Sequence, residues 1–192
     1  MRYDFIGDIH GYAGLLEQIL FKLGYQPEGE SYVVHEEDCK VVFLGDYIDR
    51  GPQNRRVIEI VRSMTEKGRA IALMGNHEFN AICYHTPASS GNDYLRQHSS
   101  KNTKQHQAFL CEYQIDSEEL VDTISWFRSL PIWWEDLDVR AIHACWYEPA
   151  REFLFENGLA GQQGQIITEN WEIFVQNQNS DNLFNFIFFL FF

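Results

Sequence analysis

The chain has 192 residues, enough for one domain with a real core, and its 45% hydrophobic and 22% charged residues are ordinary for a globular protein. Its net charge of −13 argues against a nucleic-acid duplex as the main partner. No apolar run reaches the ~20 residues of a membrane span, no signal peptide is visible, and four cysteines without a Cys-x-x-Cys pair favour a reduced, cytoplasmic protein.

The first predicted unit is a strand at 2–6 that ends in Gly7-Asp8-Ile9-His10-Gly11. A helix follows, because leucines and an isoleucine recur at helical spacing from Leu15 to Leu23 and Gly24 supplies a stop. Residues 25–38 are predicted to form a loop, with room for a short strand at 32–34.

The second unit is a buried strand at 41–44 followed by Gly45-Asp46-Tyr47-Ile48-Asp49-Arg50-Gly51. Two carboxylates and a guanidinium here leave a strand end within five residues, between glycines that permit a sharp turn. Carboxylates are hard ligands for divalent cations, and an arginine offers a planar fork to a phosphate. The ordinary alternative is a tight turn with a surface ion pair.

The third unit repeats the pattern. A helix is predicted from Pro52 to Met64, closed by Gly68, and a strand at 70–74 ends in Gly75-Asn76-His77-Glu78. Three successive strands that each end in a polar cluster before a helix predict an α/β layered fold, with functional groups at the carboxyl ends of the strands.

The rest of the chain contains shorter elements. Residues 85–112 are predicted to form an insertion over the site, with a polar helix at 102–111, and a helix capped by Ser117 or Asp116 follows. Strands at 132–135 and 139–143 end in His143-Ala144-Cys145-Trp146, and helices are predicted at 148–155 and 168–174. No linker is visible, so residues 1–192 are predicted to form a single domain.

Five residues at the ends of four strands have the chemistry of metal ligands: Asp8, His10, Asp46, Asn76 and His143. A pair of metal ions needs a shared carboxylate, and imidazole with oxygen ligands suits manganese, iron or zinc. Taken singly, each residue has an ordinary explanation as a helix cap, a loop or core histidine, or a turn amide.

These motifs, in this order, resemble the three signatures of the calcineurin-like metallophosphoesterases. Within that superfamily they are similar to the phosphoprotein phosphatase branch, which includes serine/threonine phosphatases and bacterial symmetrical diadenosine tetraphosphatases. The resemblance covers Met1 to about Trp146, but Ala144 and Cys145 stand where protein phosphatases usually have glycines. It implies a four-layer α-β-β-α sandwich, here incomplete at its C-terminal end.

The resemblance also implies roles. Asp8 and His10 would bind a first metal, Asn76 and His143 a second, and Asp46 would bridge them. The bridging water would attack phosphorus, and Arg50 would hold the phosphate oxygens. His77 would protonate the leaving oxygen as general acid, with Asp49 orienting its ring.

The implied function is dinuclear-metal-dependent hydrolysis of phosphoric esters or anhydrides. Manganese is the expected metal, with iron, zinc, nickel or cobalt as alternatives. The substrate is left open between a phosphoprotein, a dinucleoside polyphosphate and a small phosphate ester, and so is the oligomeric state. The alternative is a truncated metal-binding relative with weak or no activity.

Two segments carry further expectations. Between residues 79 and 111 Asp93 is the only acidic residue, whereas Arg96, Lys101 and Lys104 are basic, so this stretch is expected either to receive substrate phosphates or to be a solvated polar surface. In the tail, 177–192, six of the 15 phenylalanines occupy the last nine positions, and no histidine follows His143 to complete the second metal site as in the family. The tail therefore suggests a truncated or frame-shifted reading frame.

Overall fold

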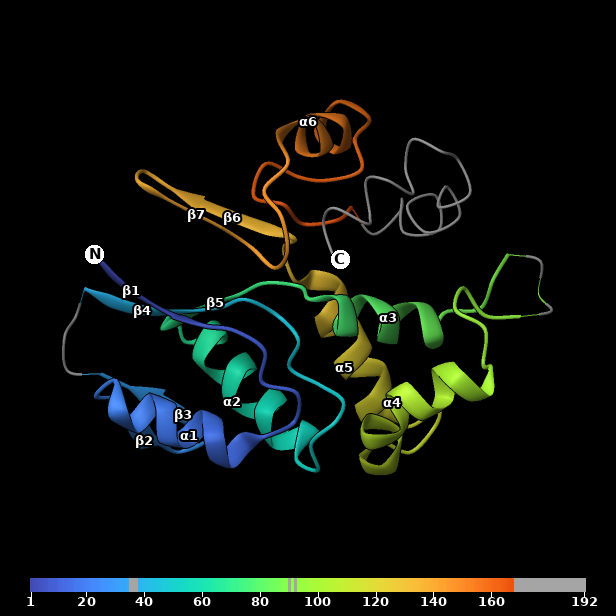
Figure 1. Ribbon diagram of the computed structural model, residues 1–192, viewed down its shortest axis with the longest axis horizontal. Coiled ribbons are helices and arrows are strands. Elements are labelled where there is room, and N and C mark those ends of the chain that lie inside the picture. Colours follow the sequence, from blue (N-terminus) through green and yellow to red (C-terminus); the bar gives the residue numbers. More distant parts are fainter. Residues whose placement is uncertain (35–37, 90, 92, 168–192) are drawn as a thin grey trace.

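The computed structural model describes residues 1–34, 38–89, 91 and 93–167, and it has an α/β fold built on a parallel sheet (Figure 1). The sheet contains β1 (Arg2–Ile6), β4 (Cys39–Phe43) and β5 (Ala70–Ala72), in the order β1-β4-β5. Because both neighbouring pairs are parallel, all three strands end at the same edge of the sheet. That edge carries the three polar motifs.

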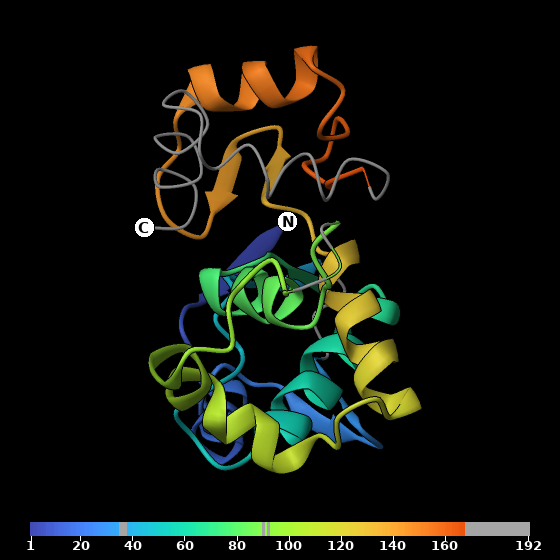
Figure 2. The ribbon, with the colours of Figure 1, turned by 90° about the vertical axis from the view of Figure 1, so that its right-hand side faces the viewer.

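Layers cover the sheet on both faces (Figures 1 and 2). On one side lie α1 (Ala13–Lys22), α2 (Asn54–Glu66) and a small hairpin of β2 (Gln26–Glu28) and β3 (Ser31–Val33). On the other lie the antiparallel hairpin of β6 (Trp133–Asp136) and β7 (Val139–Ile142) and then α6 (Glu148–Glu156). The predicted α/β class is confirmed, with the layers in the order helices, sheet, hairpin, helix.

Three more helices lie beside the sheet: α3 (Asn76–Tyr84), α4 (Ser100–Glu112) and α5 (Glu118–Ser129). The start of α5 decides between the two predicted caps. The Ser117 hydroxyl accepts a hydrogen bond from the Leu120 backbone N–H at 3.1 Å, so Ser117 is the N-cap. Asp116 instead has a positive φ of 60° in the preceding turn.

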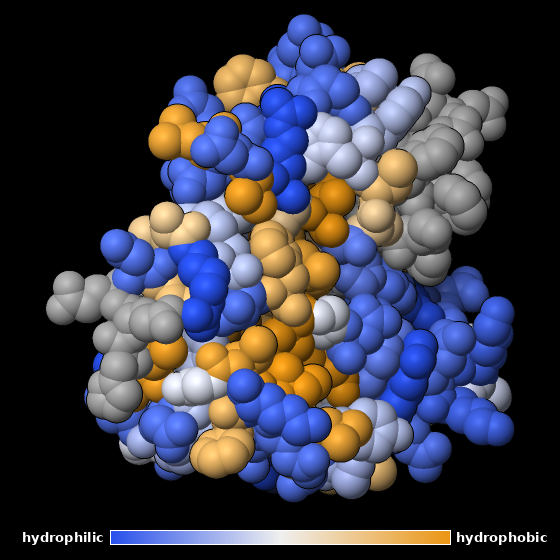
Figure 3. All heavy atoms as spheres, turned by 60° about the vertical axis from the view of Figure 1, so that its left-hand side comes forward, coloured by the Kyte–Doolittle hydropathy of each residue, from blue (hydrophilic) through white to orange (hydrophobic). Residues whose placement is uncertain are grey.

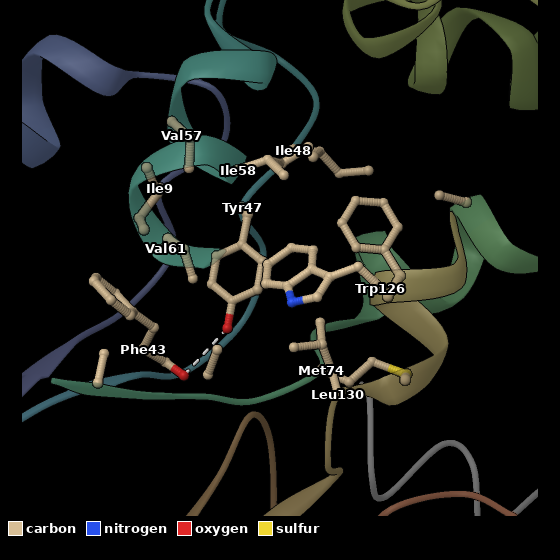
Figure 4. Packing of buried hydrophobic residues seen from close by; sticks show 14 of the residues in the cluster. Ile9, Phe43, Tyr47, Ile48, Val57, Ile58, Val61, Met74, Trp126 and Leu130 are labelled. Atoms are coloured by element: carbon tan, nitrogen blue, oxygen red, sulfur yellow. Dashed lines mark hydrogen bonds between the residues drawn. The ribbon is translucent and has the colours of Figure 1, made fainter. Parts of the chain in front are cut away.

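The loop after β4 is anchored in the core by two adjacent residues, Tyr47 and Ile48, that lie between its two aspartates (Figure 4). Tyr47 and Ile48 are fully buried, and the Tyr47 ring lies 6.1 Å, between centroids, from that of Trp126 on α5. The Tyr47 hydroxyl donates to the carbonyl of Leu73 at 2.5 Å. These contacts fix the flanking Asp46 and Asp49 relative to the sheet.

Helix α1 buries a narrower face than its sequence predicts. Leu16 and Leu20 are buried, whereas Leu15 and Ile19 are 57% and 43% exposed. Figure 3 shows apolar side chains gathered on the face of the molecule that carries β1 and α1. A groove of about 430 Å³ on this face is lined by Phe5, Leu15 and Ile19 among others. The apolar positions between Leu15 and Leu23 therefore form a wider face of the helix than the neighbouring described residues bury.

Several predicted boundaries shift by a few residues. The second helix begins at Asn54 and not at Pro52, because the preceding residues form the turn that carries Gly51. Residues 26–28 and 31–33 pair as a hairpin where mainly a loop was predicted. The predicted helix at 168–174 and the tail at 177–192 lie outside the described residues.

Two sequence expectations concern the environment of the protein. None of the helices that the structure describes is both long and apolar enough to cross a membrane. All four cysteines carry free thiols, and their reduced state in the cell stays a prediction. The cytoplasmic location stays a prediction.

Candidate metal centre

The three motif loops touch one another at the carboxyl edge of the sheet, and glycine makes this contact feasible. A Cβ atom on Gly75 would lie 2.3 Å from the backbone nitrogen of Asp46. One on Gly51 would lie 2.6 Å from the carbonyl of Gly11. No side chain fits at either distance, so these glycines let the loops after β1, β4 and β5 pack backbone against backbone.

Four residues of these loops have left-handed backbones that are uncommon for residues other than glycine. Their φ values are 49° for His10, 57° for Asp46, 69° for Asp49 and 64° for Arg50. Such conformations cost free energy and persist where the surrounding structure enforces them, and they gather at functional sites. Here they belong to residues that the sequence marks as ligands or phosphate contacts.

The first set of predicted ligands consists of Asp8, His10 and Asp46. His10 is 5% exposed, and its Nδ1 donates to the Ile48 carbonyl at 3.0 Å, which leaves Nε2 with its lone pair. Nε2 is buried, has no hydrogen-bond partner, and lies 3.6 Å from an Asp8 oxygen and 3.7 Å from an Asp46 oxygen. A lone pair facing two carboxylates fits a divalent cation between them.

The second set of predicted ligands consists of Asp46, Asn76 and His143. The Nδ1 of His143 donates to the Leu44 carbonyl at 2.8 Å, which again leaves Nε2 with its lone pair. That Nε2 lies 3.6 Å from Asp46 Oδ1 and 3.1 Å from the Asn76 side-chain oxygen. The side-chain oxygen of Asn76 therefore faces only acceptors, the Asp46 carboxylate and His143 Nε2. A cation between these atoms would turn the repulsion among them into attraction. Asp46 belongs to both sets, as a bridging ligand must.

His77 stands at the border between the metal sites and the cavity beside them. Its Nδ1 donates to Asp49 Oδ2 at 2.7 Å, and its Nε2 lies 4.0 Å from Asp46 Oδ2. Burial lowers the pKa of His77, but the hydrogen bond to Asp49 and the charge of Asp46 outweigh it, so the pKa is raised. With His10 and Asp46, His77 forms a close group of potential ligand atoms, so its position is open to a metal-binding role as well as a proton-donating one.

The Asp49 carboxylate holds two histidines. Besides His77, it accepts a hydrogen bond from Nδ1 of His106 on α4 at 3.0 Å. Burial raises the pKa of Asp49, but the hydrogen bonds from the two histidines lower it by more. The pKa of Asp49 therefore lies below its usual range. From the sequence alone, His106 could be described only as part of the basic stretch between residues 79 and 111. No spacing signal could have paired it with a residue 57 positions earlier.

Glu78 has a role that its motif position alone did not assign. It is fully buried, and one oxygen accepts from the N–H groups of Asp46 at 2.8 Å and Gly75 at 3.0 Å. The other accepts from the Tyr47 N–H at 2.8 Å. Burial, with the nearby charge of Asp46, raises the pKa of Glu78 to about 7, against the effect of these N–H donors. Glu78 thus ties the loop after β4 to the start of α3.

A cavity of about 900 Å³ opens beside the second ligand set. It is lined by Asp49, Arg50, Asn76 and His77 together with residues of the predicted insertion, including Arg96, Lys101 and Lys104. Among the described residues, Arg50, Arg96, Lys101 and Lys104 form no ion pair with a carboxylate. The cavity therefore carries positive charge in a chain of net charge −13. The status of 85–112 as an insertion stays a prediction.

The sequence of this chain matches a known protein family and several curated proteins. A family model described as calcineurin-like phosphoesterase matches residues 1–179. A bis(5'-nucleosyl)-tetraphosphatase PrpE from Oceanobacillus iheyensis is 43% identical over 77 residues, which are 40% of this chain and 30% of the relative. The matched stretch thus spans less than a third of that protein. It is named asymmetrical, whereas the motifs were compared with symmetrical tetraphosphatases.

Two solved structures share the fold at low sequence identity. The cold-active protein-tyrosine phosphatase of a psychrophilic Shewanella has a TM-score of 0.55 at 19% identity, over 98% of this chain and 56% of its own. The phosphatase domain of the Legionella effector WipB has a TM-score of 0.55 at 12% identity, over 97% and 81%. These likenesses agree with the fold of the residues that the structure describes.

Proposed function

The chain belongs to the calcineurin-like phosphoesterase family, and we propose on that basis that it hydrolyses phosphoric esters or anhydrides with a pair of divalent metal ions. The observation that supports the pair is the position of Asp46, whose two oxygens face His10 on one side and His143 on the other. Manganese is the proposed metal, since mixed imidazole, carboxylate and amide ligands suit it, with iron, zinc, nickel or cobalt as alternatives.

The ligand residues would divide between two positions. Asp8 and His10 would hold one ion, Asn76 and His143 the other, and Asp46 both. When bound, the two ions would acidify a water molecule and neutralise charge on the phosphoryl group. The carbonyl groups of Ile48 and Leu44 keep the Nε2 atoms of His10 and His143 available as ligands, because each carbonyl takes the Nδ1 proton of its histidine.

Two cavity residues would act on the substrate. His77 has Nε2 near Asp46 and Nδ1 held by Asp49, which supports the proposal that it would give a proton to the leaving oxygen. The exposed Arg50 lines the same cavity, and its guanidinium would bind the phosphoryl oxygens. If His77 bound a metal instead, its replacement would lower metal content, and this measurement separates the two roles.

Among the three substrate classes, we propose a dinucleoside polyphosphate. The uncompensated cations of the cavity suit a leaving group that carries several phosphates. The similarity to a protein named bis(5'-nucleosyl)-tetraphosphatase supports the same choice. A phosphoprotein is the second candidate, favoured by the fold shared with a protein-tyrosine phosphatase.

A substrate panel tests the proposal. The purified protein with added manganese is assayed against diadenosine tetraphosphate, p-nitrophenyl phosphate and a phosphotyrosine peptide, and kcat/KM is compared. The proposal expects the highest value for diadenosine tetraphosphate. A highest value for the peptide would favour the second candidate. No turnover of any of them with any of the five metals, in protein that binds metal, would instead favour a catalytically inactive metal-binding relative.

A further inference from the structure

Asp49 is the meeting point of two histidines from different parts of the chain. His77 lies in the first turn of α3, and His106 lies near the middle of α4. Their Nδ1 atoms contact opposite oxygens of the carboxylate, at 2.7 Å for His77 and 3.0 Å for His106. Asp49 and His106 are 3% and 5% exposed, so water competes little for these bonds.

The contacts with Asp49 show which nitrogen of His77 and of His106 carries a proton. An ionised carboxylate only accepts, so both Nδ1 atoms donate to Asp49. Nε2 of His106 faces Nε2 of His85 at 3.3 Å, and one of these two atoms must donate. Burial lowers the pKa of His85 to about 4, so His85 is neutral, and its Nε2 donates to or accepts from His106 according to its tautomer.

Helix α4 is also fixed to the start of α2, which directly follows the loop that carries Asp49. The Glu112 carboxylate at its end accepts from the backbone N–H groups of Asn54 at 2.6 Å and Arg55 at 2.9 Å, at the start of α2. The side-chain oxygen of Asn54 in turn accepts from the Asp49 N–H at 2.6 Å. The His106 ring also stacks on Phe109 at 4.7 Å between centroids. His106 is therefore held rigidly against Asp49.

We propose that His106 is a positioning residue for the proton donor His77 and acts through Asp49. With one oxygen held by His106, the carboxylate keeps a single orientation and offers the other to His77. The His77 ring is then fixed with Nε2 directed toward Asp46 and the cavity. The basic stretch would thus contribute to the chemical step as well as to substrate binding, and the catalytic part of this inference rests on the proposed function.

Variants of His106 test the role against a matched control. His106→Phe keeps a ring in the buried site but removes the donor to Asp49. His106→Asn keeps an N–H donor at the place of Nδ1. The control is His98→Phe, because His98 lies in the same stretch, stacks on Tyr84 at 3.9 Å, and makes no contact with Asp49.

Steady-state kinetics provide the first measurement. Loss of a residue that orients an active-site group costs roughly 10- to 100-fold. His106→Phe is expected to lower kcat by about that factor for an alkyl phosphate and by less for p-nitrophenyl phosphate, whose leaving group needs little protonation. KM and metal content should stay unchanged, and His106→Asn should recover most of the activity. An equal loss for both substrates, with no recovery in His106→Asn, would overturn the positioning role.

Nuclear magnetic resonance of ¹⁵N-labelled histidine gives a second measurement that does not depend on activity. The His77 signal is assigned by its absence in His77→Asn. It should shift in His106→Phe, return toward its native position in His106→Asn, and stay in place in His98→Phe. An unmoved His77 signal in His106→Phe overturns the inference even if the enzyme is active. An inactive native protein whose His77 signal does shift would instead contradict the proposed function and retain the structural link.

Discussion

The two ligand sets of the candidate metal centre are built in different ways. Asp8, His10 and Asp46 follow β1 and β4, which pair directly in one parallel sheet. Asn76 follows β5 in the same sheet, at the first turn of α3, but His143 comes from the end of a hairpin in another layer and is held by a hydrogen bond to the Leu44 carbonyl. Strand pairing thus brings the first set together and also places Asn76, whereas the packing of layers brings His143 to the second.

The sets also differ in charge. The first contains two carboxylates and an imidazole, and the second contains the shared carboxylate with a neutral amide and an imidazole. A divalent cation gains more from two carboxylates than from one. We therefore infer that the first position is the stronger, and four experiments test the difference between the two positions.

The largest expected effect comes from the residue that both sets share. Asp46→Asn should abolish hydrolysis and lower the metal content of the protein, because it removes the bridging charge from both positions. His10→Ala should abolish hydrolysis too, with loss from the first position. Metal is measured by mass spectrometry of the purified variants, and Asp138→Asn, in an exposed turn, is the control. Native metal content and full activity in Asp46→Asn would contradict the two-metal proposal.

The next effect concerns His77, which stands between the sets and the substrate. His77→Asn should lower kcat by roughly 10²- to 10⁴-fold, the usual contribution of a general acid, while metal stays bound. The loss should be smaller for p-nitrophenyl phosphate than for alkyl phosphates. A variant that loses metal would show that His77 is a ligand, and an equal loss for both substrates would count against the acid role.

A direct comparison of the two positions comes from metal titration. Calorimetry with manganese should resolve one strong and one weak binding event. His143→Ala should remove the weak event and leave the strong one, because His143 belongs to the second set alone. Two events of equal affinity would show that another residue of this chain strengthens the second position.

The smallest expected effect lies in the cavity. Reversing charge at Lys101 and Lys104, by Lys→Glu at both positions, should raise KM for diadenosine tetraphosphate several-fold, since a contact between unit charges in water is worth about 1 kcal/mol. The increase should shrink at high salt. Lys22→Glu with Lys67→Glu makes the same change in net charge outside the cavity. If both double variants behave alike, the basic stretch is only a solvated surface.

Sequence-based prediction succeeded where local signals determine the structure and failed where contacts between distant residues determine it. The strands β1 and β4, the helices α1, α2 and α5 and the three motif loops were predictable, because apolar periodicity and glycine position are local signals. Boundaries shifted where tertiary contacts set them, as at Asn54, whose side chain bonds to Gly51 and Glu112. The burial of α1 was overestimated, since periodicity gives an apolar face but not the area that neighbours cover.

The residue types of the candidate centre, their order along the chain and their places at strand ends could be predicted from the sequence, since parallel pairing brings the ends of β1, β4 and β5 to one edge. The folded structure was needed to show that His106 contacts Asp49, that Glu78 ties the loop after β4 to α3, and that Leu44 orients His143. These are contacts between side chains and partners 31 to 99 positions away. A hydrogen bond of this kind leaves no period or spacing in the sequence, because its geometry exists only once separate layers have packed.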